Sequence, residues 1–168
     1  MARITTAHLG AAITKVGAMN LAEQEQLSDA IHRHQPNLLY SVVALKLSGA
    51  TMDDIGVVLK LLMVCYQAMQ QSGDTWPLIS EATQEHNLAR ITKRLRKSER
   101  LSAAKQLAFI EKTILTHPEK TLLAYVVEEI NNPDLPADDE TAKRMMLVAL
   151  NLVECIAQPT KPTPKHKR

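Results

Sequence analysis

The chain has 168 residues, near the usual length of one domain, so it can bury a sizeable core without disulfides or metals. Hydrophobic residues make up 45% and charged residues 23%, which excludes a chain that is disordered throughout, and the net charge of +2 is unremarkable. With only one Trp, one Phe and three Tyr, the core must be aliphatic, which favours packed helices over a β-sandwich.

Helix start and stop signals divide the chain into segments. Asn20 with Glu23, and Thr51 with Asp54, have the spacing of a cap and an acid that bond reciprocally. Prolines stand where helices begin and glycines where they end: Pro36, Pro77, Pro118, Pro136, Gly49 and Gly73. The predicted helices cover residues 21–33, 37–48, 52–71, 79–97, 99–116, 119–132 and 137–157, with a weaker one over 4–17. We therefore expect an all-α, compact bundle of about seven helices, forming one domain over residues 1–158.

Two of the predicted helices are apolar on almost every side. Residues 55–69 contain only Lys60 and Gln67 as strongly polar side chains, and residues 145–157 only Asn151 and Glu154. Helices of this kind lie at the centre of a protein. We expect them to pack against each other, because large exposed apolar patches are uncommon on monomers. An exposed groove for a partner is the alternative.

The order of features in residues 20–71 recurs in residues 99–157. The repeated features are an apolar helix ending in His34 or His117, a Leu-Leu-x-x-Val-Val pattern, and a pair of aspartates that opens an apolar helix. Two similar three-helix units would produce this order, and so would chance alignment of Leu-rich helices. An internal duplication is therefore a hypothesis.

Charge is segregated along the chain, with a basic excess over residues 85–120 and an acidic excess over residues 121–158. The basic side chains share one helix face opposite Leu88, Ile91 and Leu95, and the candidate polyanion-binding set is Arg90, Lys93, Arg94, Lys97 and Arg100. Such a face binds nucleic acid, an acidic protein or anionic lipid. The alternative is a solvated face that docks on the acidic 121–158 segment, since no stacking aromatics accompany the helix.

The last ten residues, 159–168, alternate Pro and Thr with basic side chains and contain no apolar residue to support ordering. We expect a disordered basic tail that either adds to the field of the basic helix or maintains solubility.

Motifs for catalysis, cofactors and metals are absent from the sequence. The chain has no glycine-rich phosphate loop and no nucleophile elbow, and its single Asp29-x-x-His32 is too little for a di-iron centre. Cys65 and Cys155 lack neighbouring ligands, so no metal or cofactor is predicted. An enzyme with a dispersed site, for example Glu81, Glu85 and His86, is a weak alternative.

Both cysteines lie in apolar runs, which is typical of buried free thiols in a reducing compartment. Lys15 interrupts the apolar stretch near the N-terminus, so we expect no secretory signal. The longest apolar run, residues 55–66, is interrupted by Lys60 and is too short to cross a bilayer, so we expect no membrane span and a cytoplasmic location. The lack of acids before Glu23 leaves a transit peptide as the alternative. The function is not readable from the sequence. The favoured hypothesis is a helical interaction or scaffold module that binds a protein partner or forms a homodimer, and the second is a nucleic-acid-associated regulator.

Overall fold

A computed structural model describes residues 2–132, 135 and 138–158, and these residues form eight α-helices, one 3₁₀ helix and no strand. The helices are α1 (Thr6–Gly17), α2 (Leu21–His34), α3 (Pro36–Val43), η1 (Ala44–Ser48, 3₁₀), α4 (Met52–Ser72), α5 (Glu81–Ser98), α6 (Ala103–Thr116), α7 (Lys120–Ile130) and α8 (Asp139–Ala157). The predicted all-α class is confirmed, and the weaker first helix is formed. The predicted disordered tail, residues 159–168, lies outside the described residues.

Both predicted capping boxes are confirmed. The side chain of Asn20 accepts the Glu23 backbone N–H at 2.9 Å, and the Glu23 carboxylate accepts the Asn20 N–H at 3.3 Å. Thr51 and Asp54 make the same exchange at the start of α4. Each exchange satisfies backbone donors that have no partner within the helix, so these two helix starts are fixed by local chemistry.

The two glycines predicted to end helices have left-handed backbone conformations. Gly49 has a φ of 91° and Gly73 a φ of 74°, which residues with a side chain rarely adopt. The single helix predicted over residues 37–48 is wrong in one respect, because α3 ends at Val43 and the chain continues to Gly49 as η1. A 3₁₀ ending tightens the last turn and satisfies carbonyls that the α-helix would leave unpaired.

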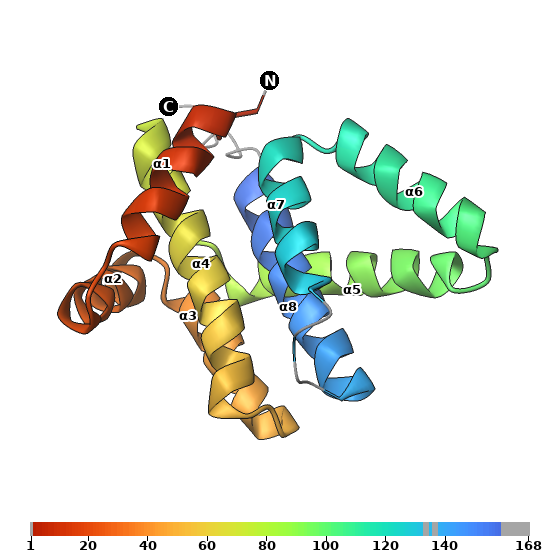
Figure 1. The fold of residues 1–168 in the computed structure, drawn as a ribbon, viewed down its shortest axis with the longest axis horizontal. Helices are drawn as coiled ribbons and strands as arrows, with labels where there is room; N and C mark the ends of the chain where they lie inside the picture. The colour runs from red at the N-terminus through yellow and green to blue at the C-terminus, as the bar shows by residue number, and fades with distance from the viewer. Residues whose placement is uncertain (1, 133–134, 136–137, 159–168) are drawn as a thin grey trace, which may run out of the picture.

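The core is built around α4 and α8, which lie next to each other in the middle of the molecule (Figure 1). Leu62 and Met69 of α4, and Met145 and Leu152 of α8, are among the largest fully buried side chains. The prediction that the two apolar helices pack against each other is therefore confirmed. Burial of one such side chain contributes roughly 1.5–3 kcal/mol to folding, so this contact is a main source of stability.

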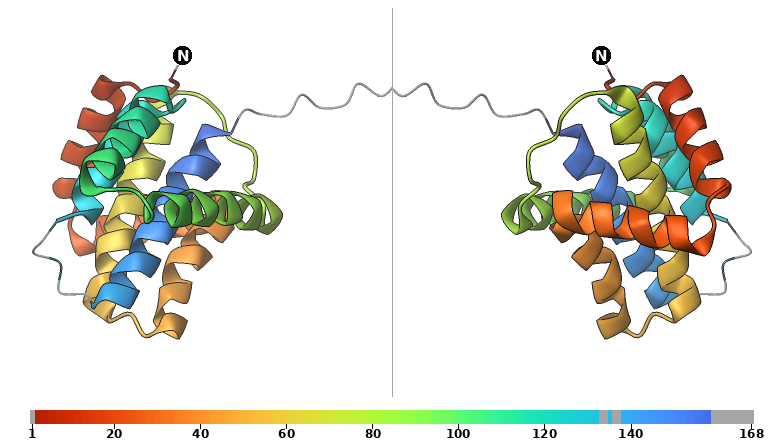
Figure 2. Two further views of the ribbon diagram at one scale, coloured as in Figure 1. Left: turned by 90° about the vertical axis from the view of Figure 1, so that its right-hand side faces the viewer. Right: turned by 90° about the vertical axis from the view of Figure 1, so that its left-hand side faces the viewer.

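The two halves of the chain repeat one order of helix packing. In the first half α1 packs on α4, α2 on α3 and α3 on α4; in the second half α5 packs on α8, α6 on α7 and α7 on α8. Figure 2 shows α2 and α5 running crosswise to α4 and α8, although the counterpart of α2 in this order is α6. One difference is clear: Leu27 and Ile31 of α2 are buried, whereas the matched Ile110 of α6 is 42% exposed. Common descent of the halves stays a prediction.

A buried polar clamp ties the N-terminus to the end of α8. The carboxylate of Glu119, 2% exposed, accepts the backbone N–H groups of Arg3 at 3.0 Å and Ile4 at 3.2 Å. The Arg3 guanidinium stacks 4.2 Å from the ring centre of Trp76 and donates to the carbonyl of Ile156, as does the Trp76 indole. Segments far apart in the sequence are thereby joined beside the α6–α7 junction.

Candidate functional site

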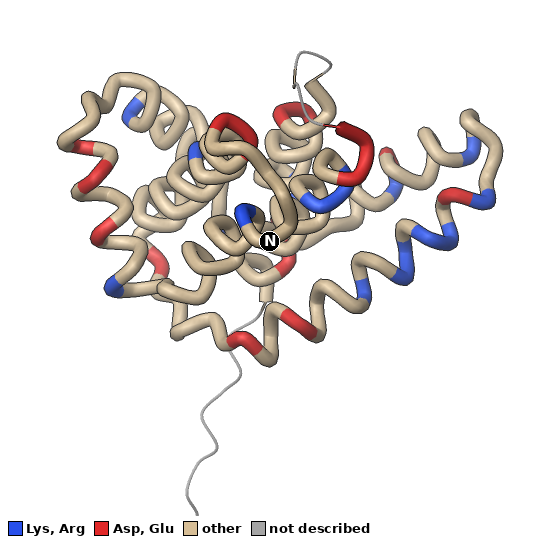
Figure 3. The backbone as a smooth tube through the Cα atoms, turned by 90° about the horizontal axis from the view of Figure 1, so that it is seen from below, with Lys and Arg blue, Asp and Glu red and all other residues tan. Residues whose placement is uncertain are grey.

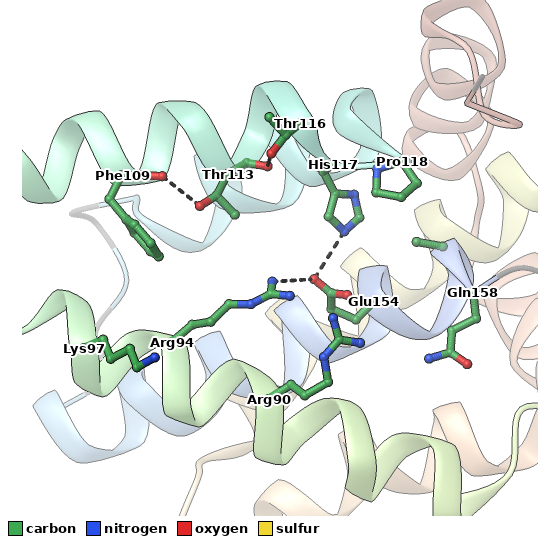
Figure 4. Close-up of a pocket in the computed structure, with 11 residues that line it drawn as sticks. Arg90, Arg94, Lys97, Phe109, Thr113, Thr116, His117, Pro118, Glu154 and Gln158 are labelled. Atoms are coloured by element: carbon green, nitrogen blue, oxygen red, sulfur yellow. Dashed lines mark hydrogen bonds and ion pairs between the residues drawn. The ribbon is translucent and has the colours of Figure 1, made fainter.

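An open cleft lies between the C-terminal half of α5 and α6, and Figure 1 shows these two helices diverging from the turn that joins them. Its largest cavity, about 510 Å³, has Arg90, Arg94 and Lys97 on the α5 side. Phe109, Thr113 and His117 stand opposite, and Glu154 of α8 lies between the two walls (Figure 4). The cleft exists because α6 packs chiefly on α7 and diverges from α5, so that no residue of α6 is buried.

The placement of α5 follows from its contacts with α8. Ser80 caps the helix by accepting the Thr83 N–H at 3.1 Å, and the buried face presents Asn87 and Ile91 to the core. The Asn87 amide donates to the Cys155 sulfur at 3.5 Å and accepts from Gln158 at 2.9 Å. These bonds fix the rotation of α5 about its axis. The opposite, basic face is consequently turned partly into the cleft and partly into solvent.

Glu154 is the electrostatic centre of the cleft. Its Oε1 lies 3.2 Å from Nε2 of His117 and 3.5 Å from the guanidinium of Arg94. The hydrogen bond from His117 lowers the pKa of the Glu154 carboxyl below its ordinary value of 4.5, and the charges of Arg94 and Arg90 act in the same direction against the effect of burial. Glu154 is therefore ionised at neutral pH.

His117 has a defined hydrogen-bonding role at the turn between α6 and α7. Its Nδ1 accepts the backbone N–H of Glu119 at 3.0 Å, so in the neutral ring the proton lies on Nε2 and is donated to Glu154. His34 and His117 stand at the ends of α2 and α6, and each contacts a side chain of another helix. His34 bonds the hydroxyl of Tyr66 on α4 at 2.7 Å, as His117 bonds Glu154 on α8.

The floor of the cleft is apolar. A second cavity, about 100 Å³, shares Arg94, Phe109 and Glu154 with the first. Apart from those shared residues its walls are mostly aliphatic: Ile91, Leu95, Ile110, Ile114, Leu123, Val127 and Leu150. A third cavity, about 340 Å³, opens on the other side of Phe109 and Ile110, against Met146 and Leu147. All three cavities meet at Phe109, and together they are the groove between α5 and α6, whose walls combine Arg and Lys side chains with aliphatic ones.

The structure divides the predicted basic set. Arg90, Arg94 and Lys97 line the main cavity, whereas Lys93, exposed on α5, and Arg100, exposed just beyond its end, do not line it. In Figure 3 the acids of α5 stand at its start and the cations follow along the rest of the helix. The alternative was that the basic face docks on the acidic segment, residues 121–158. One such contact is present, the Arg94–Glu154 ion pair.

Sequence reasoning did not identify the apolar face of α6 or Glu154 as parts of a site. The sequence of α6 shows a run of apolar residues, which indicates an apolar helix face. Whether another helix covers that face depends on the fold and could not be predicted. Glu154 was visible as a rare acid in an apolar helix. The dispersed catalytic group Glu81, Glu85 and His86 lies exposed on α5.

Within the described residues, no three His, Cys, Asp or Glu side chains are grouped so that they could hold a metal ion. The described helices also include none with the length and apolar character needed to cross a membrane. Comparison with known protein families, curated proteins and solved structures finds no match to this chain.

Proposed function

We propose that this chain is a helical interaction module and that the groove between α5 and α6 is its binding site for a protein partner. The observation that carries the proposal is the exposure of α6, because none of the 14 residues of this helix is buried. Ile110, which lines the groove, is 42% exposed, and Leu107 and Leu115, which lie on α6 outside the cavities, are 60% and 72% exposed. An isolated helix of this length is marginal in water, so packing normally stabilises it.

Internal comparison supports the same proposal. The residues of α2 that match Ile110 and Ile114 in the repeated pattern are Leu27 and Ile31, which are 8% and 0% exposed. In the first half of the chain this face is covered, and in the second half it lines an open groove. Contiguous apolar surface with a polar rim is typical of interaction sites.

Site-specific photo-crosslinking in the cell of origin tests the proposal. A photoreactive amino acid at position 110 is compared with the same group at position 47, where Leu47 is 92% exposed on η1. We expect one discrete adduct from position 110, none of that mass from position 47, and its loss in the variant Phe109→Asp. Identical adducts from both positions, or no adduct at 110, would contradict the proposal.

A nucleic-acid-associated role is the second candidate, favoured by the outward part of α5. Lys93 and Arg96 on α5, and Arg100 just after it, are exposed and form no ion pair with any described residue. Replacement of all three by Gln should flatten the dependence of log affinity on log salt for a labelled 20-nucleotide single strand, since each lost phosphate contact removes about 0.7 units of slope. Absence of any salt-dependent binding by the unmodified chain excludes this role.

A further inference from the structure

We infer that the occupant of the groove is an acidic amphipathic helix about three turns long. The inference rests on the proposed binding role of the cleft and adds the shape and charge of the partner.

The length comes from the stripe of α8 along which the three cavities lie. Lys143, Met146, Leu147, Leu150, Glu154, Ala157 and Gln158 line them in turn. These positions recur every three or four residues, so they occupy one face of α8. From Met146, the first apolar residue of the stripe, to Ala157 at the end of α8, the stripe extends about 17 Å at 1.5 Å per residue, which is the length of a helix of about 11 residues.

The helical form follows from the walls. Every wall of the groove is a helix, and the described residues contain no strand whose edge an extended peptide could join. Side chains spaced at i, i+3, i+4 and i+7 on an occupant would pack between α5 and α6 as one helix packs into the grooves of another. Phe109 lines all three cavities and is the central apolar contact available to such a helix.

The acidic charge follows from the balance of side chains lining the groove. Two acids line it, Glu99 and Glu154, and Glu154 is already held by Arg94 and His117. The cations that line it are Arg90, Arg94, Arg96, Lys97 and Lys143. Among the described residues, Arg94 alone of these five forms an ion pair. The rim therefore favours carboxylates on the flanks of the occupant and disfavours ammonium groups.

The test uses three fluorescent peptides of 18 residues with one Leu face at i, i+3, i+4 and i+7. Their flanking positions are Glu, Gln or Lys, and a fourth peptide has the Glu sequence with two central prolines. Binding to the full chain is followed by fluorescence anisotropy, and amide chemical shifts of the isotope-labelled chain locate the site. We expect the Glu peptide to bind and to shift amides of α5 and α6. The Gln peptide should bind about tenfold more weakly, the effect of two partly exposed ion pairs, and the Lys and proline peptides should not bind.

Matched variants separate charge from fold. Arg90→Gln with Lys97→Gln should weaken the Glu peptide about tenfold and leave the Gln peptide unchanged. Lys15→Gln with Lys46→Gln, an equal charge change at exposed positions on α1 and η1, should change neither. Helical circular dichroism of all variants confirms that the fold is retained.

Several results overturn the inference. Equal affinity for the Glu, Gln and Lys peptides removes the acidic requirement, and binding of the proline peptide removes the helical one. Failure of every peptide to bind removes an acidic partner helix as the occupant. The same follows if the unlabelled chain displaces the Glu peptide and light scattering shows that the chain forms dimers. A discrete adduct from position 110 in the cell would still stand in each case, so failure of this inference is distinguishable from failure of the proposed function.

Discussion

Removal of the Glu119 carboxylate should destabilise the fold more than removal of any exposed acid. The variant Glu119→Ala leaves the backbone N–H of Ile4, a fully buried residue, and that of Arg3 without their acceptors. A buried donor left unpaired costs about 1–3 kcal/mol. Two such donors would give about 2–6 kcal/mol, and because the N–H of Arg3 is only partly buried the expected loss is in the lower half of that range, against a total stability of roughly 5–15 kcal/mol for a domain of ordinary size.

The measurement is urea unfolding followed by circular dichroism, with the free energy of unfolding from linear extrapolation. Glu119→Gln keeps one carbonyl oxygen and should fall between the wild type and Glu119→Ala. Glu128→Ala is the matched control. Glu119 is the cap of α7 and Glu128 lies within the same helix, but Glu128 is exposed, so its removal should cost no more than about 0.5 kcal/mol.

Hydrogen exchange at Ile4 provides a local readout of the same clamp. The amide of Ile4 should exchange more rapidly in Glu119→Ala than in Glu128→Ala, because only the first loses the acceptor. A Glu119→Ala chain that is within 0.5 kcal/mol of the wild type and still protects Ile4 would refute the assignment of Glu119 as the anchor of the N-terminus.

Three further predictions follow from burial, charge and backbone conformation. Burial raises the pKa of the Cys65 thiol to about 12 and also raises the pKa of the Cys155 thiol. Both thiols should therefore react with thiol reagents far more slowly in the folded chain than in urea. Rapid labelling of the native chain would contradict their burial. Because the pKa of Glu154 is lowered by folding, its contribution to stability is present above pH 4.5 and is lost as the pH falls through the lower, folded-state value. The wild type should therefore lose more stability between pH 5 and pH 3 than Glu154→Gln, and parallel pH profiles would show that the carboxylate contributes nothing. Gly49→Ala should lower the stability of the fold by about 1–2 kcal/mol because the position has a φ of 91°. Gly10→Ala should raise it by about 0.5–1 kcal/mol, because Gly10 lies inside α1 and no atom is near the added carbon. A change of melting temperature in the same direction for both variants would contradict these conformations.

The helix boundaries were largely predictable because they depend on neighbouring residues. The exchange between Asn20 and Glu23 needs only three residues of helix to form, and the left-handed backbone at Gly73 needs only the missing side chain. The central position of α4 and α8 was also predictable, since helices that are apolar on most sides have few other places in a water-exposed fold. The conversion of the end of α3 to η1 was not, because the energies of the two helix types differ little over one turn.

The basic set shows what helical periodicity can predict about a site and what it cannot. Periodicity placed Arg90, Arg94 and Lys97 on one face, and they do share a cavity wall. Periodicity could not predict which residues lie opposite that wall, because they are 12 to 68 positions away in the chain.

The sequence by itself determined the class of structure, the helix ends and the amphipathic faces, all of which result from interactions within a few residues. Tertiary structure decided which faces were covered and which were left open. His117 and Glu154, 37 residues apart, meet only because α7 packs on α8, and most apolar side chains of α6 are exposed only because it diverges from α5. Contacts of this kind depend on the packing of whole helices, which no local pattern of residues specifies.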